Sequence, residues 1–297
     1  MVRGISARED VRDAVRRLAH RRLEPAVDAL GLSSDVDFDE VVHDVRKRCK
    51  RVRALLRLVR DHLPDDVYRR ENRTVRDAAR QLSPVRDAAV LVRVHDEVVG
   101  AGAVPIPDFR TALVDDHERL RRQVLDDDTV PMLRQRLATV VGRIETWPVE
   151  EAEWDVLGVG LGRVYRRGRK AMAAALDEPT TEHFHEWRRR AKYLRLQLDL
   201  LKELWPEVIG GMAKSAHALT DVLGDEHDLA VLASALDGAA IHQEGQARLL
   251  AELIASRRAL LQARARPIGL RLYAEKPSRF IARLGHYWEA ERSATAA

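Results

Sequence analysis

Two stretches of the chain carry the same pattern of one histidine and three basic residues, at offsets 0, 3, 7 and 10. The first set is His43, Arg46, Lys50 and Arg53, and the second is His185, Arg188, Lys192 and Arg195. Since offsets of three and four residues fall on one side of an α-helix, each set forms a stripe along a helix. Like charges at this spacing oppose helix formation slightly, so folding does not need the stripe. Its obvious use is to bind a polyanion.

A solvated helix face, with its charges paired to acids elsewhere, is the alternative explanation for these cations. This alternative would have to explain why the same four positions carry these residue types in both helices. The acids that follow the histidines, Asp44 and Glu186, face about 100° away from the stripes. The pattern therefore favours anion binding, and arginine suits this because its planar guanidinium grips phosphate oxygens in pairs.

Further cations lie beside the stripes. Arg57 continues the first stripe and Arg189 neighbours the second. Arg166 and Lys170 share one face of a third basic cluster, at residues 163–170, where surface charge without a ligand is nearly as good an explanation. The two stripes are unequal in length, because the repeat equivalent of Arg57 is Asp199.

The two histidines could ligate a metal, take part in catalysis or donate hydrogen bonds. A zinc site would need further His, Cys, Asp or Glu ligands, but the helical neighbours of His43 and His185 are cations. Catalysis would need a nucleophile or a carboxylate partner, and neither motif supplies one. Donation to a phosphate oxygen and a buried hydrogen bond that fixes helix packing both stay open. The sequence predicts no metal, no cofactor and no catalytic residue.

Several familiar motifs are missing from the chain. There is no GxxxxGK[ST], no GxGxxG and no HExxH, and the paired Glu-x-Glu pattern of a metal-dependent triphosphate tunnel is not found either. Tryptophan and tyrosine are scattered and not interleaved with basic residues, which argues against a stacking platform for single-stranded nucleic acid. We therefore expect a protein that is not an enzyme.

The elements that position these residues are helices, because strand patterns are nearly absent and helical periodicity runs almost throughout. Short breaks containing Pro, Gly, Asp or Ser separate them. Helices are predicted over about 8–30, 38–62, 66–81, 84–99, 108–125, 131–146, 151–177, 181–204, 206–222, 225–242 and 245–265.

The repeat extends to the apolar side of each motif helix. Val42, Val45, Cys49, Val52, Leu56 and Val59 are matched 142 residues later by Phe184, Trp187, Ala191, Leu194, Leu198 and Leu201. The sequence predicts an all-α fold in which an internal duplication gives two four-helix bundles, related by a pseudo-two-fold axis, with a central basic groove. We expect a single domain over 1–297. It would comprise a first repeat at about 8–100, bridging helices at 108–146, a second repeat at 151–243 and C-terminal helices at 245–290.

Composition limits where the protein works. The chain has 297 residues, of which 45% are hydrophobic and 33% charged, with a formal net charge of +4. Cys49 is the only cysteine, which excludes an internal disulfide and favours a reducing compartment. The N-terminus lacks an apolar signal region, and no apolar run approaches the roughly 20 residues of a membrane span. We expect a soluble cytoplasmic protein that does not contact membranes.

The duplicated His-x-x-Arg-x-x-x-Lys-x-x-Arg helix and the segment YRRGRK (165–170) make the chain resemble the CHAD family, the conserved histidine α-helical domains. The resemblance covers nearly the whole chain. It implies two four-helix bundles around a basic groove, binding of inorganic polyphosphate and association with polyphosphate granules. The CYTH triphosphatase domain that often accompanies CHAD domains is missing here. Carried over by position, the ligand candidates are His43, Arg46, Lys50, Arg53, His185, Arg188, Lys192 and Arg195, with Arg166 and Lys170 added.

Three functions follow as hypotheses. The first is non-enzymatic binding of polyphosphate, with granule-associated proteins as candidate further partners. The second is nucleic-acid binding by a helical protein, with RNA or DNA as the polyanion. The third is a metal-dependent phosphohydrolase accessory, which ranks last because the sequence offers no clustered carboxylates to hold the metal.

Overall fold

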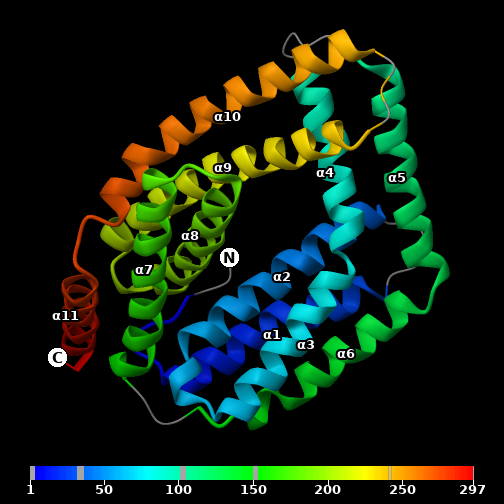
Figure 1. Cartoon of the computed structure of the whole chain (residues 1–297). Coiled ribbons are helices and arrows are strands. Elements are labelled where there is room, and N and C mark those ends of the chain that lie inside the picture. Colours follow the sequence, from blue (N-terminus) through cyan, green and yellow to red (C-terminus); the bar gives the residue numbers. More distant parts are fainter. Residues whose placement is uncertain are drawn as a thin grey trace.

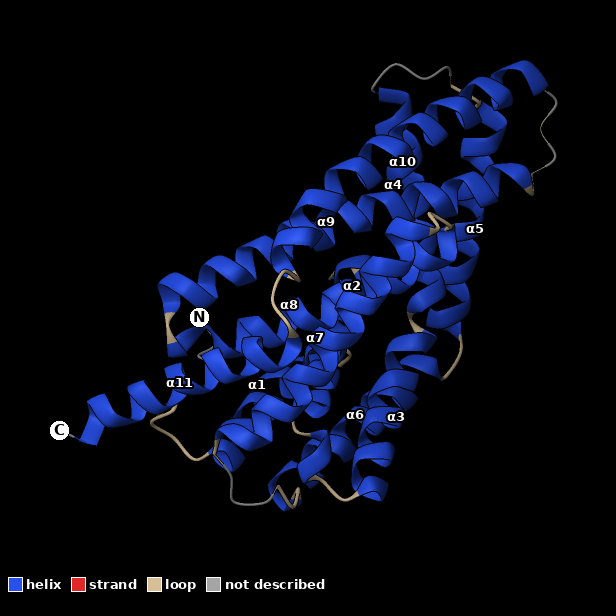
Figure 2. Ribbon diagram, turned by 60° about the vertical axis from the view of Figure 1, so that its left-hand side comes forward, coloured by secondary structure: helices blue, strands red, loops and turns tan. Residues whose placement is uncertain are grey.

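The computed structural model describes residues 4–31, 37–100, 105–149, 153–239, 241 and 243–296. Within these residues the chain is helical and has no strand, which confirms the predicted all-α class (Figures 1 and 2). The α-helices are α1 (Val11–Ala29), α2 (Phe38–Leu58), α3 (Asp65–Gln81), α4 (Ser83–Gly100), α5 (Pro107–Asp126), α6 (Thr129–Arg143), α7 (Trp154–Asp177), α8 (Thr181–Leu201), α9 (Pro206–Asp237), α10 (Glu244–Leu272) and α11 (Pro277–Ala296). Short 3-10 turns are η1 (Arg60–His62), η2 (Ile144–Thr146) and η3 (Lys202–Leu204).

The two motif helices, α2 and α8, are built alike. Each has 21 residues, and each is followed by a 3-10 turn. Asp37 caps α2 by accepting a hydrogen bond from the Asp39 backbone N–H, and Thr180 caps α8 by accepting one from the His183 N–H. Such caps satisfy N–H groups that have no partner within the helix, and so they fix where each basic stripe begins.

The first bundle consists of α1, α2, α3 and α6. Its core contains the apolar face predicted for α2, since Val42, Val45, Cys49, Val52, Leu56 and Val59 are all fully buried. Helix α6 contributes Leu133, Leu137 and Val140 to the same core. Helix α6 lies within residues 108–146, which were predicted to bridge the two halves, and its apolar face is buried against α1 and α3.

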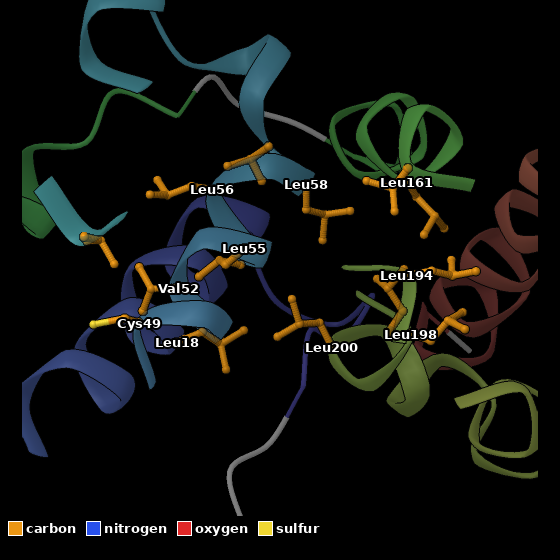
Figure 3. Packing of buried hydrophobic residues seen from close by; sticks show 14 of the residues in the cluster. Leu18, Cys49, Val52, Leu55, Leu56, Leu58, Leu161, Leu194, Leu198 and Leu200 are labelled. Carbon is orange, nitrogen blue, oxygen red and sulfur yellow. The ribbon is translucent and has the colours of Figure 1, made fainter. Parts of the chain in front are cut away.

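The second bundle consists of α7, α8, the first part of α9, and α11. The apolar face predicted for α8 is also buried here, with Trp187, Ala191 and Leu194 fully inaccessible. The buried residues of both bundles form one continuous core, and Leu58 of α2 and Leu200 of α8 lie between the two bundles (Figure 3). The internal duplication itself stays a prediction.

Helix α9 is continuous where two helices, 206–222 and 225–242, were predicted. The predicted break contains Gly224, but a single glycine destabilises a helix by only about 1 kcal/mol. The helix continues through it, with Leu223 and Glu226 on either side buried. Residues 240 and 242 of the predicted second helix, and residue 151 at the predicted start of α7, lie outside the described residues. In the first half the chain does break between α3 and α4, where Pro84 cannot continue the hydrogen-bond ladder.

The length of α9 creates a third packing unit. Helices α9 and α10 run side by side from the second bundle towards α4 and α5 (Figure 1). There, Phe109 of α5, Leu232 of α9 and Ile254 of α10 share a second, separate apolar core with Val94 and Val98 of α4. Helix α4 thus leaves the first bundle and packs with the far end of α9.

The second bundle approaches the first closely at α2, where α7 packs against it. A Cβ atom at Gly160 of α7 would overlap the carbonyl oxygen of Leu58, so only glycine allows this approach. Across the same joint, the buried Gln197 side chain of α8 donates a hydrogen bond of 3.3 Å to the Ala54 carbonyl of α2. These contacts hold α7 and α8 of the second bundle against α2 of the first.

Candidate anion-binding site

The structure brings the middles of the two basic stripes together. Lys192 of α8 is partly buried, and its pKa falls to about 7 because of that burial and because Lys50, Arg188 and Arg195 are close. The pKa of Lys50 on α2 falls to about 8 through burial and the nearby Arg46 and Arg188. Lys50, Arg188 and Lys192 are therefore mutual neighbours, and we call these three residues the central cluster.

Acidic residues offset the charge of the central cluster only in part. Asp228 of α9 raises the pKa of Lys192, and Asp87 of α4 raises that of Lys50, but neither outweighs the combined effect of burial and nearby cations. Each cation also makes it costlier for its neighbours to stay charged. A bound anion would relieve this cost, so the cluster is arranged to receive negative charge.

Arg46 has a different role from the one predicted. It is only 8% exposed, and it donates hydrogen bonds to the Ala79 carbonyl at 3.1 Å and to the Ser83 hydroxyl. Its guanidinium also lies 3.4 Å from Asp87. These bonds join α2 to the junction of α3 and α4, so Arg46 positions the stripe, while its buried Nε has no hydrogen-bond partner.

Acidic partners are also present for part of the second stripe. Arg188, the repeat equivalent of Arg46, lies 3.9 Å from Asp228 but is more exposed than Arg46. Arg189 pairs with Glu186 on the same helix, although the helical wheel placed that acid away from the stripe. Asp228 and Glu186 thus account for some of the charge that the pattern alone attributed to a ligand.

The ends of the stripes keep donors available. Arg53 donates to the Asn72 side chain at 3.2 Å, and Arg195 lies 3.4 Å from a ring nitrogen of His217. The guanidinium of Arg57 lies over the Tyr193 ring, 4.4 Å from its centre. Neither Arg57 nor Arg195 forms an ion pair with a described carboxylate, so the exposed N–H groups of both arginines could bind oxygen atoms of an anion.

The motif histidines are exposed at the start of each stripe. Burial and the cations Arg86, Lys47 and Lys50 lower the pKa of His43, and burial with Arg188 and Arg189 lowers that of His185. The exposure of His43 argues against the buried, packing role that had been left open. His185 instead lies beside His227 of α9, with ring nitrogens 3.2 Å apart.

His227 is a site residue that the stripes do not reveal, since it comes from a different helix. Burial and nearby cations, Arg188 foremost, lower its pKa to about 4. Within the part of the chain that the structure describes, no group of three or more His, Cys, Asp or Glu side chains could hold a metal ion. Cys49 is fully buried with a pKa raised to about 12 by that burial, which fits a structural thiol.

The third predicted cluster lies apart from the central cluster. Arg166 and Lys170 are both exposed on α7. Arg166 is near Arg163, since together with Arg60 and Arg167 it helps to lower the pKa of that residue. Lys170 makes no ion pair with any described residue, and nothing in the structure places it beside the two stripes.

No helix among the described residues combines the length and apolar character required to cross a membrane.

Comparisons with known proteins agree with this architecture. The family model of the CHAD domain matches residues 21–237, which is most of the chain. The fold is similar to the crystal structure of the CHAD domain from the plant Ricinus communis, with a TM-score of 0.69. That match has 17% sequence identity and covers 93% of this chain and 96% of the plant chain, so it bears on the fold alone. No curated protein matches the sequence. Both motif helices lie inside the matched residues, and the chain belongs to the CHAD domain family.

Proposed function

We propose that this protein binds inorganic polyphosphate through the central cluster and the stripes that lead to it, without altering the ligand chemically. CHAD domains are associated with polyphosphate-related proteins, which makes this ligand the first to consider. The observation that supports the proposal most is the meeting of Lys50, Arg188 and Lys192 from two bundles. Partly buried cations held together at a cost to stability fit a site that is completed by an anion.

Polyphosphate fits the chemistry of the stripes. It is a flexible chain with a negative charge on every phosphate unit and no bases or sugars to accommodate. Arginine can grip non-bridging oxygens in pairs, while lysine acts as a mobile point charge. Contacts of moderate strength, repeated from His43 to Arg57 and from His185 to Arg195, would add up along such a chain. Targeting to polyphosphate granules, or a part in their storage or regulation, would follow from this binding.

A role without catalysis fits the residues around the central cluster. Two carboxylates near the central cluster, Asp87 and Asp228, pair with Arg46 and Arg188, and no group of three or more His, Cys, Asp or Glu side chains among the described residues could hold a metal ion. His43 has Arg86, Lys47 and Lys50 as neighbours, and His185 lies beside Arg188, Arg189 and His227. Within the described part of the chain, neither histidine forms a hydrogen bond with a hydroxyl or thiol group that could act as a nucleophile. Release of phosphate from polyphosphate in the presence of Mg²⁺ or Mn²⁺ would contradict this part of the proposal.

The test compares charge reversal at two pairs of positions. Lys50→Glu with Lys192→Glu reverses two charges in the central cluster, and we expect it to abolish binding of long-chain polyphosphate. Arg136→Glu with Lys276→Glu makes the same change in net charge at two exposed residues on α6 and before α11. This control should bind nearly as well as the wild type.

Circular dichroism and thermal unfolding of both variants would show that the comparison is between folded proteins. Normal affinity in the folded Lys50→Glu, Lys192→Glu variant would disprove the site. Equal losses in the two variants would mean that only overall charge matters.

A further inference from the structure

A second basic site lies at the far end of the first stripe. Five arginines and two tyrosines surround a small cavity that leaves about 20 Å³ for the centre of a water molecule. This is room for about one water molecule, so an anion would be held by the arginines at the mouth of the cavity, and a long segment of chain could not enter. We call it the arginine cavity. It is lined by Arg57, Arg60, Tyr68, Arg163, Val164, Arg167, Arg190 and Tyr193, from α2, η1, α3, α7 and α8.

The arginine cavity has an excess of positive charge. Asp61 pairs with Arg163, and Glu186 pairs with Arg190 at 2.6 Å. The other three arginines, at positions 57, 60 and 167, have no acidic partner among the described residues. Burial lowers the pKa of Arg163 most, and the charges of Arg60, Arg167 and Arg166 lower it further. These arginines therefore lie close together.

Two of these arginines are held in place by aromatic rings. The guanidinium of Arg57 lies 4.4 Å from the centre of the Tyr193 ring, and that of Arg60 lies 4.8 Å from the centre of the Tyr68 ring. Stacking of this kind orients a guanidinium but leaves the N–H groups at its edge free. Neither Arg57 nor Arg60 has an acidic partner among the described residues. The edges of these two guanidiniums therefore offer oriented N–H groups that no carboxylate neutralises.

The equivalent positions of the sequence repeat do not carry the same excess of charge. With the offset of 142 residues, Asp199 corresponds to Arg57, Arg51 to Tyr193 and Arg48 to Arg190. In that equivalent region Asp199 lies near Arg51 and Arg22, where its charge partly opposes the lowering of both pKa values. An acid thus balances cations there, whereas the arginine cavity has Arg57 in its place.

We propose that the arginine cavity binds the terminal phosphoryl group of a linear polyphosphate, while the chain behind it follows the first stripe to the central cluster. This inference rests on the proposed function and names the part of the ligand that the cavity takes. Arg57 and Lys50 are seven residues apart on α2, which is about 10 Å, with Arg53 between them. One arginine cavity would hold one chain end.

The end of a polyphosphate differs chemically from its interior. Like a phosphate monoester, a terminal phosphoryl group has three non-bridging oxygens and carries a second negative charge above a pKa of about 6. An internal unit has two non-bridging oxygens and one charge, and chain extends from it on both sides. The extra oxygen and extra charge match the unpartnered donors of Arg57, Arg60 and Arg167, and a small cavity accommodates an end more readily than a unit flanked by chain.

The test uses two anions that differ in having ends. Linear tripolyphosphate has two terminal phosphoryl groups, whereas cyclic trimetaphosphate has none. Calorimetric titration of the wild type should show linear binding about tenfold tighter or more, the effect of one charge-assisted hydrogen bond. The ratio of the two affinities should approach one in Arg57→Gln with Arg167→Gln. It should stay at the wild-type value in Arg136→Gln with Lys276→Gln, which removes the same charge elsewhere.

The same samples separate this inference from the proposed function. Each protein is also titrated with long-chain polyphosphate, and circular dichroism verifies its fold. A wild type that binds both small anions equally, or a folded Arg57→Gln, Arg167→Gln variant that keeps the ratio, would overturn the cavity assignment even if long chains bind. A wild type that ignores long chains but prefers the linear anion would instead overturn the proposed function and leave the arginine cavity as a site for terminal phosphoryl groups.

Discussion

Replacing Lys192 with methionine should make the free protein more stable and a weaker binder. The side chain is partly buried on α8, and its pKa falls from 10.5 to about 7 on folding. A group whose pKa is lowered on folding destabilises the folded state below its folded pKa, and this penalty disappears as the pH rises towards the unfolded value. At 1.36 kcal/mol per pKa unit, the penalty near neutral pH is on the order of 4 kcal/mol, and solvent screening and relaxation could halve it.

The assay is urea unfolding of the wild type, Lys192→Met and the exposed-site control Lys276→Met, at pH 6.5 and pH 9.5. Methionine keeps the length and the apolar stem of the side chain, so packing is largely preserved. We expect Lys192→Met to gain on the order of 2–4 kcal/mol at pH 6.5 and much less at pH 9.5, with the control unchanged. A variant that is no more stable than the wild type at pH 6.5, or whose gain does not depend on pH, would refute the view that crowding of cations strains this site.

Three further predictions concern binding and the joints of the fold. Polyphosphate affinity should rise as the pH falls from about 8.5 to 6.5, because the ligand binds the charged form of Lys192, whose pKa in the unliganded protein is about 7. Calorimetry in buffers of different ionisation enthalpy should show that binding takes up protons, and binding without proton uptake would contradict this prediction. Arg46→Ala should cost on the order of 2–4 kcal/mol in urea unfolding, because it removes the buried bonds to the α3–α4 junction; a loss below about 1 kcal/mol would mean that these bonds matter little. Gly160→Ala should destabilise the protein by more than about 2 kcal/mol, because the added Cβ overlaps the Leu58 carbonyl. The control Gly142→Ala, at a position that faces open space, should be neutral or slightly stabilising. Equal effects of the two substitutions would show that the close approach at Gly160 is not the cause.

Much of the helical architecture could be predicted because each motif helix repeats its apolar side chains at the helical period. That period identifies Val45, Val52 and Leu194 as core without knowledge of the partner helix, and all three are fully buried. Which helices pack together could not be predicted in the same way. The burial of α6 in the first bundle depends on contacts with α1 and α3, which are distant in sequence. The continuity of α9 through Gly224 depends on the hydrogen bonds of the surrounding helix, whereas the helix propensity of glycine alone predicts a break.

The site shows the same division. A stripe on one helix is visible in the sequence, and Lys50 of the first stripe lies close enough to Lys192 of the second to lower its pKa. The commitment of Arg46 to Ser83 and Asp87 was missed because those partners lie about 40 residues away on another helix. Likewise, no single-helix pattern reveals the arginine cavity, since its lining residues come from several elements.

The most direct test of the central claim is a titration of the wild-type protein with long-chain polyphosphate at two salt concentrations, with RNA of equal total charge as competitor. The account predicts tight binding that weakens steeply as salt increases, because the protein's cations release counterions from the polyphosphate when they bind it. It also predicts that RNA displaces the bound polyphosphate poorly. RNA that binds equally well or better would contradict it, since the stripes would then be a general cationic surface and nucleic acid would become the first candidate ligand.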